Sequence, residues 1–83
     1  MEIVTVQRIE EGSEMEKVLV FLGRYSELSF PCKKIRRELV RMDDIPRTSA
    51  KVEYTLRKLY DKELIVRFGS PGKYEYKIKK SRP

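Results

Sequence analysis

The run of residues 43–79 most constrains how this chain can fold, because it contains a turn, a basic helix and a hairpin without interruption. At the start of this run, Asp43 and Asp44 end the helical pattern of the residues before them. Pro46 then biases Ile45 away from the helical conformation. We expect Ile45 to drop into the core at this turn. A helix over residues 48–62 and a pair of strands over 64–79 are predicted to follow.

The helix over 48–62 separates apolar from polar positions. Thr48 or Ser49 can cap its start, because either hydroxyl can accept a hydrogen bond from an otherwise unpaired amide. At 100° per residue one face is apolar and is expected to be buried; it consists of Val52, Leu56, Leu59 and Tyr60. The exposed face is expected to carry Arg47, Lys51, Tyr54 and Lys58, with Ala50, Arg57 and Asp61 beside them.

The last segment has the alternation of a half-buried strand pair. Strands are predicted over residues 64–68 and 73–79, and a loop of turn formers, Gly69-Ser70-Pro71-Gly72, joins them. Tyr74, Tyr76 and Ile78 occupy one strand face. We expect this face to pack on the helix over 48–62 in preference to stacking with bases.

A first helix is predicted over 13–24. Ser13 and Glu16 have capping-box spacing, in which the hydroxyl accepts from the Glu16 amide and the carboxylate accepts from the Ser13 amide. Its apolar stripe consists of Met15, Val18, Leu19 and Leu22, and Gly23 is its expected stop. Residues 1–12 are rich in β-branched side chains and are expected to form an extended arm or a strand.

A second helix is predicted over 31–42, after a short strand over 28–30. Pro31 suits the first turn of a helix, where an amide hydrogen is not needed. One side of this helix is apolar and consists of Cys32, Ile35, Leu39 and Met42, and the remainder is basic. This helix, the turn and the helix over 48–62 therefore form a helix-turn-helix unit, with the hairpin behind it.

Composition places this unit in one small intracellular domain. A chain of 83 residues supports a single core. The lone Cys32 cannot form an internal disulfide or a metal-ligand pair, and we predict neither a membrane span nor a signal peptide, so a cytoplasmic location is expected. Charged residues make up 39% of the chain, and thermolabile amides are nearly absent, which is typical of a hyperthermophilic source such as an archaeon or its virus.

Charge is concentrated in the part with the helix-turn-helix pattern. Residues 1–31 hold three basic and six acidic side chains, whereas residues 32–83 hold sixteen basic and seven acidic ones.

From Ser13 to Ile78 the chain resembles a winged helix-turn-helix transcription regulator of the bacterial and archaeal type. The resemblance is carried by Val52, Leu56, Leu59, Leu64 and Ile65. Many members have Gly before the first wing strand, where this chain has Glu63.

The resemblance implies an α+β winged-helix fold and double-stranded DNA as the partner. The helix over 48–62 would enter the major groove, with Arg47, Ser49, Ala50, Lys51, Tyr54 and Lys58 as DNA-binding candidates. The start of the second helix would meet phosphates through Lys33, Lys34 and Arg37. The wing would meet the adjacent backbone or minor groove through Arg67, Ser70 and Lys73.

Catalysis is not expected. The chain has no His, and Cys32 lies on an apolar stripe, so a general base near neutrality and a paired nucleophile are both missing; no cofactor, metal or small-molecule ligand is predicted.

Two binding roles remain. One is a DNA-binding regulator, expected to be a homodimer through the apolar arm, the first helix or both, unless the arm pairs with its own sheet. The other is a protein-interaction module in a transcription, replication or chromosome-partition assembly.

Overall fold

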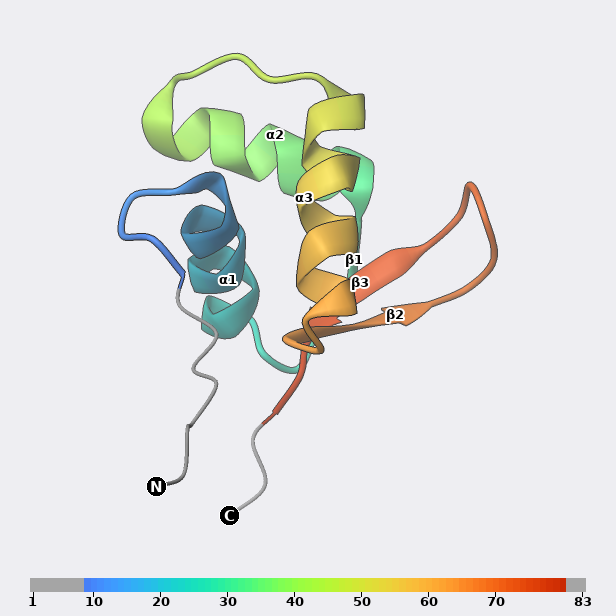
Figure 1. Cartoon of the computed structure of the whole chain (residues 1–83). Coiled ribbons are helices and arrows are strands. Elements are labelled where there is room, and N and C mark those ends of the chain that lie inside the picture. Colours follow the sequence, from blue (N-terminus) through green and yellow to red (C-terminus); the bar gives the residue numbers. More distant parts are fainter. Residues whose placement is uncertain (1–8, 81–83) are drawn as a thin grey trace, which may run out of the picture.

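The computed structural model describes residues 9–80, which form an α+β fold of three helices and a small antiparallel sheet (Figure 1). The element order is α1 (Glu14–Arg24), β1 (Phe30–Pro31), α2 (Cys32–Asp43), α3 (Ser49–Asp61), β2 (Ile65–Phe68) and β3 (Glu75–Ile78). The predicted fold class is therefore confirmed at the level of three helices and one three-stranded antiparallel sheet. Most of the predicted N-terminal arm, residues 1–8, lies outside the described residues, as do residues 81–83.

Helix α1 begins after Ser13, whose side-chain oxygen accepts from the Glu16 amide at 3.3 Å. The return half of the predicted capping box is wrong by one residue, because the Glu16 carboxylate accepts from the Gly12 amide at 2.6 Å. The Ser13 amide instead donates to the Glu10 carbonyl. Gly23 is not the stop, since the helix continues to Arg24. Its buried residues are Val18, Phe21 and Leu22, so Phe21 belongs to the core stripe and was missed.

Helix α2 buries Ile35 and Leu39 and ends at Asp43; the next residue, Asp44, caps it in the left-handed conformation with φ 59°. The prediction that Ile45 drops into the core is wrong, because 50% of its surface is exposed. The side chain that turns inward between α2 and α3 is that of Arg47, of which only 3% is exposed. A charged group is buried here because carboxylates from α1 and α2 surround it.

Helix α3 begins as predicted, with the Thr48 hydroxyl accepting from the Lys51 amide at 3.2 Å. Its buried residues are Val52, Thr55, Leu56 and Leu59, whereas Tyr60, predicted to be buried, is 37% exposed. After the helix, the Leu64 amide donates to the Leu59 carbonyl and the Glu63 amide to the Tyr60 carbonyl. This pair of bonds closes a Schellman turn, in which Glu63 holds φ 62° where glycine is usual.

The sheet has the order β1-β3-β2, with β3 antiparallel to both neighbours. Ile65 and Tyr76 point into the core beneath the helices, as the predicted aromatic strand face requires. The hairpin extends past α3 and away from the helices (Figure 1). Its loop closes through a bond from the Lys73 amide to the Ser70 carbonyl at 2.8 Å, with Gly72 at φ 85°.

One core joins these elements. Within residues 9–80 its buried hydrophobic residues are Val18, Phe21, Leu22, Ile35, Leu39, Val52, Leu56, Leu59, Ile65 and Tyr76. Every helix and both long strands contribute to it, which fixes α3 and the hairpin relative to each other. Within residues 9–80, no helix is both long and apolar enough to span a membrane.

Candidate nucleic-acid interface

The outer surface of α3 is the part of this helix that the core leaves free. We call it the α3 face; it consists of Ala50, Lys51, Glu53, Tyr54, Arg57, Lys58 and Asp61, all exposed. Tyr54 is 62% exposed, and the Lys58 ammonium lies 5.1 Å from its ring centroid. Because Thr48 caps the helix and its apolar stripe is buried, the orientation of α3 in the fold is fixed and these side chains point away from the core.

The hairpin is attached to α3 by a stack of three side chains. The Arg67 guanidinium of β2 lies 4.0 Å from the ring centroid of Tyr60 on α3 and 4.1 Å from that of Tyr74, just before β3. The cation therefore sits between two aromatic rings, an arrangement that is favourable by about 0.5–2 kcal/mol for each ring. Tyr60 is partly exposed because it serves this stack and not the core.

A groove of about 610 Å³ separates the α3 face from the hairpin, and we call it the hairpin groove. Its α3 wall includes Ala50, Tyr54 and Arg57, and its hairpin wall includes Arg67 and Tyr74. A smaller hollow of about 370 Å³ lies between the starts of α2 and α3 and the hairpin loop, with Lys33, Ser49, Glu53 and Lys73 in its lining. Glu53 lines both spaces.

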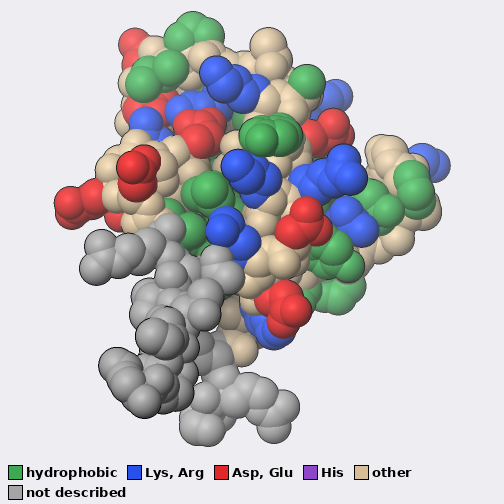
Figure 2. Space-filling view, in the orientation of Figure 1, with side chains coloured by type: hydrophobic (Ala, Val, Ile, Leu, Met, Phe, Trp, Pro, Cys, Tyr) green, Lys and Arg blue, Asp and Glu red, His purple; other side chains and the backbone are tan. Residues whose placement is uncertain are grey.

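Basic and acidic side chains are mixed over this surface. Figure 2 shows Lys and Arg side chains on the α3 side of the molecule, with carboxylates between them. The basic side chains of the α3 face, the groove and the hollow are Lys33, Lys51, Arg57, Lys58, Arg67 and Lys73, and the acidic ones are Glu53, Asp61 and Glu75. The net charge is positive, and the carboxylates restrict where a polyanion can approach.

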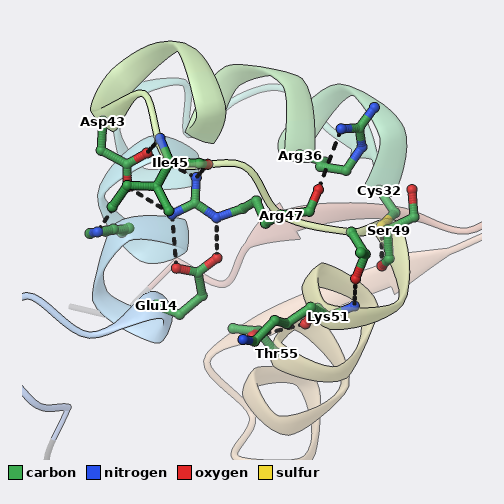
Figure 3. A network of polar contacts seen from close by, with 11 residues as sticks. Glu14, Cys32, Arg36, Asp43, Ile45, Arg47, Ser49, Lys51 and Thr55 are labelled. Carbon is green, nitrogen blue, oxygen red and sulfur yellow. Dashed lines mark hydrogen bonds and ion pairs between the residues drawn. The ribbon is translucent and has the colours of Figure 1, made fainter.

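Arg47 is not part of this surface, which corrects its predicted exposure. Figure 3 shows its guanidinium between Glu14 of α1 and Asp43 of α2. It donates to Glu14 at 2.5 and 3.0 Å, to Asp43 at 2.7 and 3.0 Å, and to the Ile45 carbonyl at 3.3 Å. Hydrogen bonds from Arg47 and then Lys17 hold the pKa of Asp43 well below its usual value of 3.8. Arg47 therefore fixes the turn between α2 and α3.

The basic residues at the start of α2 do not form one cluster. Lys33 is exposed and lines the small hollow beside Lys73. Lys34 pairs with Glu38 at 3.1 Å and lines a different hollow, with Phe21 and Tyr25. Arg37 is exposed and lines none of these spaces.

The remaining predicted residues lie along the α3 face and the hairpin. Ser49 and Ala50 form the first exposed turn of α3, and Ser70 is exposed in the hairpin loop. Arg57 is a groove residue that the predicted site omitted, although its spacing of seven from Ala50 places it on the same helix face. Glu53 and Tyr60 were also omitted from the site; their roles depend on the position of the hairpin.

The groups that could support catalysis are sparse in the described part of the chain. Burial, and then the nearby Glu53 carboxylate, raise the pKa of the Cys32 thiol to about 11, so the thiol is protonated at neutral pH. Residues 9–80 contain no group of three or more side chains placed to hold a metal ion.

No protein-family model, curated protein or solved structure matches this chain.

Proposed function

We propose that this chain is a winged-helix protein that binds double-stranded DNA and regulates transcription. The observation that carries the proposal is the α3 face, a capped and exposed helix with Lys51 and Lys58 on one side and the hairpin groove on the other. The element order, with two helices joined by a turn and followed by an antiparallel hairpin, supports the winged-helix class. Binding rather than catalysis is the activity proposed.

The dimensions of α3 fit the major groove. Its 13 residues span about 20 Å at 1.5 Å per residue, and a helix with side chains is about 10–12 Å wide, close to the width of the groove. Ala50 allows the first turn to approach base edges, and its methyl group can contact a thymine methyl. Lys51 can donate to guanine, and Tyr54 can donate to a phosphate.

The aromatic side chains favour duplex over single-stranded DNA as the ligand. Proteins that bind single strands stack bases on free aromatic faces. Here Arg67 lies against both Tyr60 and Tyr74, and Lys58 lies against Tyr54. Each of these rings therefore has a cation on one face, and a base could stack on that face only by displacing the cation.

Duplex selection from a randomised library, followed by affinity measurements against salt concentration, tests this function. A palindromic motif with half-sites about 10–11 base pairs apart would support a homodimeric regulator. A single half-site would support a monomer. Binding with a steep salt dependence but no motif would replace regulation by non-specific coating. Failure to bind any duplex at low salt would refute the DNA proposal.

One observation favours a second candidate, a protein-interaction module. A hollow of about 300 Å³ on α1 and α2 is lined by Phe21, Tyr25, Leu28 and Phe30, and Leu28 is 52% exposed. Tyr25 and Leu28 are the exposed apolar side chains of this hollow, beside Lys34, Glu38 and Arg41, and an exposed apolar patch rimmed by charged residues is typical of docking surfaces. If this role is the correct one, Lys51→Ala and Lys58→Ala leave partner binding intact, whereas Leu28→Asp abolishes it.

A further inference from the structure

We propose that Arg67 is a preformed receptor for one phosphate group, located in the hairpin groove. The inference rests on the proposed function, because it assigns that phosphate to the backbone of a bound duplex. The central carbon of the Arg67 guanidinium lies 4.0 Å from the ring centroid of Tyr60 and 4.1 Å from that of Tyr74. Such contacts engage the faces of the guanidinium plane, whereas its five N–H groups point outward within that plane.

Within residues 9–80 no hydrogen bond or ion pair occupies these N–H groups, although Arg67 is half-buried between two rings. Arg47 donates to two carboxylates and a carbonyl, and Arg41 pairs with Glu38. Arg67 is half-buried and stacked, yet it has no acceptor in the described chain. A fixed planar donor without an acceptor is suited to bidentate binding of a phosphate.

The stack also lowers the side-chain conformational entropy that Arg67 loses when it binds a phosphate. A free arginine loses much of its rotamer freedom when it binds a phosphate, but Arg67 is already confined between rings from α3 and the hairpin. Tyr60 and Tyr74 therefore act as positioning residues. They do not need to touch the ligand.

The shape of the groove favours a phosphate within a chain over a free ion. Its α3 wall extends from Ala50 to Asp61, about 16 Å at 1.5 Å per residue. Arg57 is the second cation in the lining, and Glu53 and Asp61 are the two carboxylates. The lining is thus neutral as a whole, so a small free anion gains little by entering. A DNA backbone also gains from Lys51, Lys58 and Lys73 outside the groove.

Phosphate neutralisation on a selected duplex tests the inference. Single methylphosphonate substitutions remove one backbone charge at a time. For the wild type, we expect substitution at the one backbone position that faces Arg67 in each bound copy to lower affinity about tenfold. Arg67→Lys should bind the native duplex about tenfold more weakly and should lose its sensitivity at that same position, because Lys keeps the charge but not the planar fork.

Three further variants separate positioning from general effects. Tyr60→Phe/Tyr74→Phe retains both rings and should bind like the wild type. Tyr60→Leu/Tyr74→Leu retains Arg67 without the stack and should bind as weakly as Arg67→Lys. Arg24→Lys, at the exposed end of α1, is the matched control and should not change affinity. Thermal unfolding of each variant establishes that it is folded at the assay temperature.

The outcomes distinguish this inference from the proposed function. If Arg67→Lys binds like Arg24→Lys and keeps its sensitivity to the neutral phosphate, the receptor is refuted while DNA binding stands. If no duplex binds, the side-chain Nε–Hε signal of Arg67 in NMR decides with inorganic polyphosphate, a chain of linked phosphates, as the probe. A saturable shift that Arg24 lacks would support a phosphate receptor with a different source of phosphate. An unchanged signal would refute it.

Discussion

Replacing Arg47 with methionine should destabilise the fold without removing a DNA contact. Methionine retains an unbranched side chain but cannot make the five hydrogen bonds of the guanidinium to Glu14, Asp43 and Ile45. Removing one partner of a buried ion pair costs about 3–5 kcal/mol. The Glu14 and Asp43 side chains are 28% and 20% exposed, and Lys17 still pairs with Asp43, so water and Lys17 recover part of this loss. We expect the free energy of unfolding to fall by about 2–3 kcal/mol.

Thermal and urea unfolding followed by circular dichroism measures this change. For a domain of this size, 1 kcal/mol corresponds to about 4–8 °C, so Tm should fall by roughly 10–20 °C. Arg41→Met is the matched control: its side chain is 74% exposed and pairs with Glu38 at 3.4 Å, and its loss should change the free energy by less than about 0.5 kcal/mol.

The pH dependence of stability adds a second readout. Because the pKa of Asp43 is lowered in the folded chain, its stabilising contribution is present above its usual pKa of 3.8 and is lost as the pH falls below it. This acid-induced loss should be smaller in Arg47→Met. The reasoning is refuted if Arg47→Met unfolds within about 2 °C of the wild type, or if it abolishes duplex binding at unchanged stability, since either result would place the guanidinium outside the turn.

Three further predictions follow from local geometry. Glu63→Gly should raise the free energy of unfolding by about 0.5–1 kcal/mol, because glycine adopts φ 62° without strain; a lower Tm would contradict this. The raised pKa of Cys32 means that the stability it contributes is complete below pH 9 and is lost as the pH rises through about 11, and Cys32→Ala should show a smaller loss in urea titrations at pH 8 and 11. Lys51→Ala should weaken binding to a selected site by about 1–3 kcal/mol, whereas Lys73→Ala should weaken all duplexes similarly and lower the salt slope by about one; equal, small effects would indicate non-specific coating.

Local signals in the sequence were sufficient for the three helices and for most of their buried positions. The exceptions are Phe21 and Thr55, which are buried but were not predicted to be, and Met42 and Tyr60, which are exposed. Ser13 and Thr48 cap the helices that they were predicted to cap, because capping depends on residues three positions apart. The core positions of α3 follow from its period. The failure at the end of α1 is also local: Gly23 lies within the helix and does not adopt the positive φ with which glycine ends helices.

The errors occur where long-range contacts decide. Periodicity favours an apolar residue at the α2–α3 turn, yet Ile45 is exposed and Arg47 is buried, because Glu14, 33 positions away, neutralises the guanidinium. Similarly, Tyr60 is on the edge of the apolar face but packs on Arg67 from another element. Such pairings between α1, α3 and the hairpin are not encoded in any short window of the sequence.

Mapping of amide chemical shifts on addition of a selected duplex locates the binding surface on the folded chain. If α3 and the hairpin bind DNA, the largest changes should fall on residues 49–58 and 69–74, and α1 should change little. Changes concentrated on α1 and residues 25–30, with none on α3, would contradict the account and point to the hollow around Tyr25 and Leu28 as the binding surface.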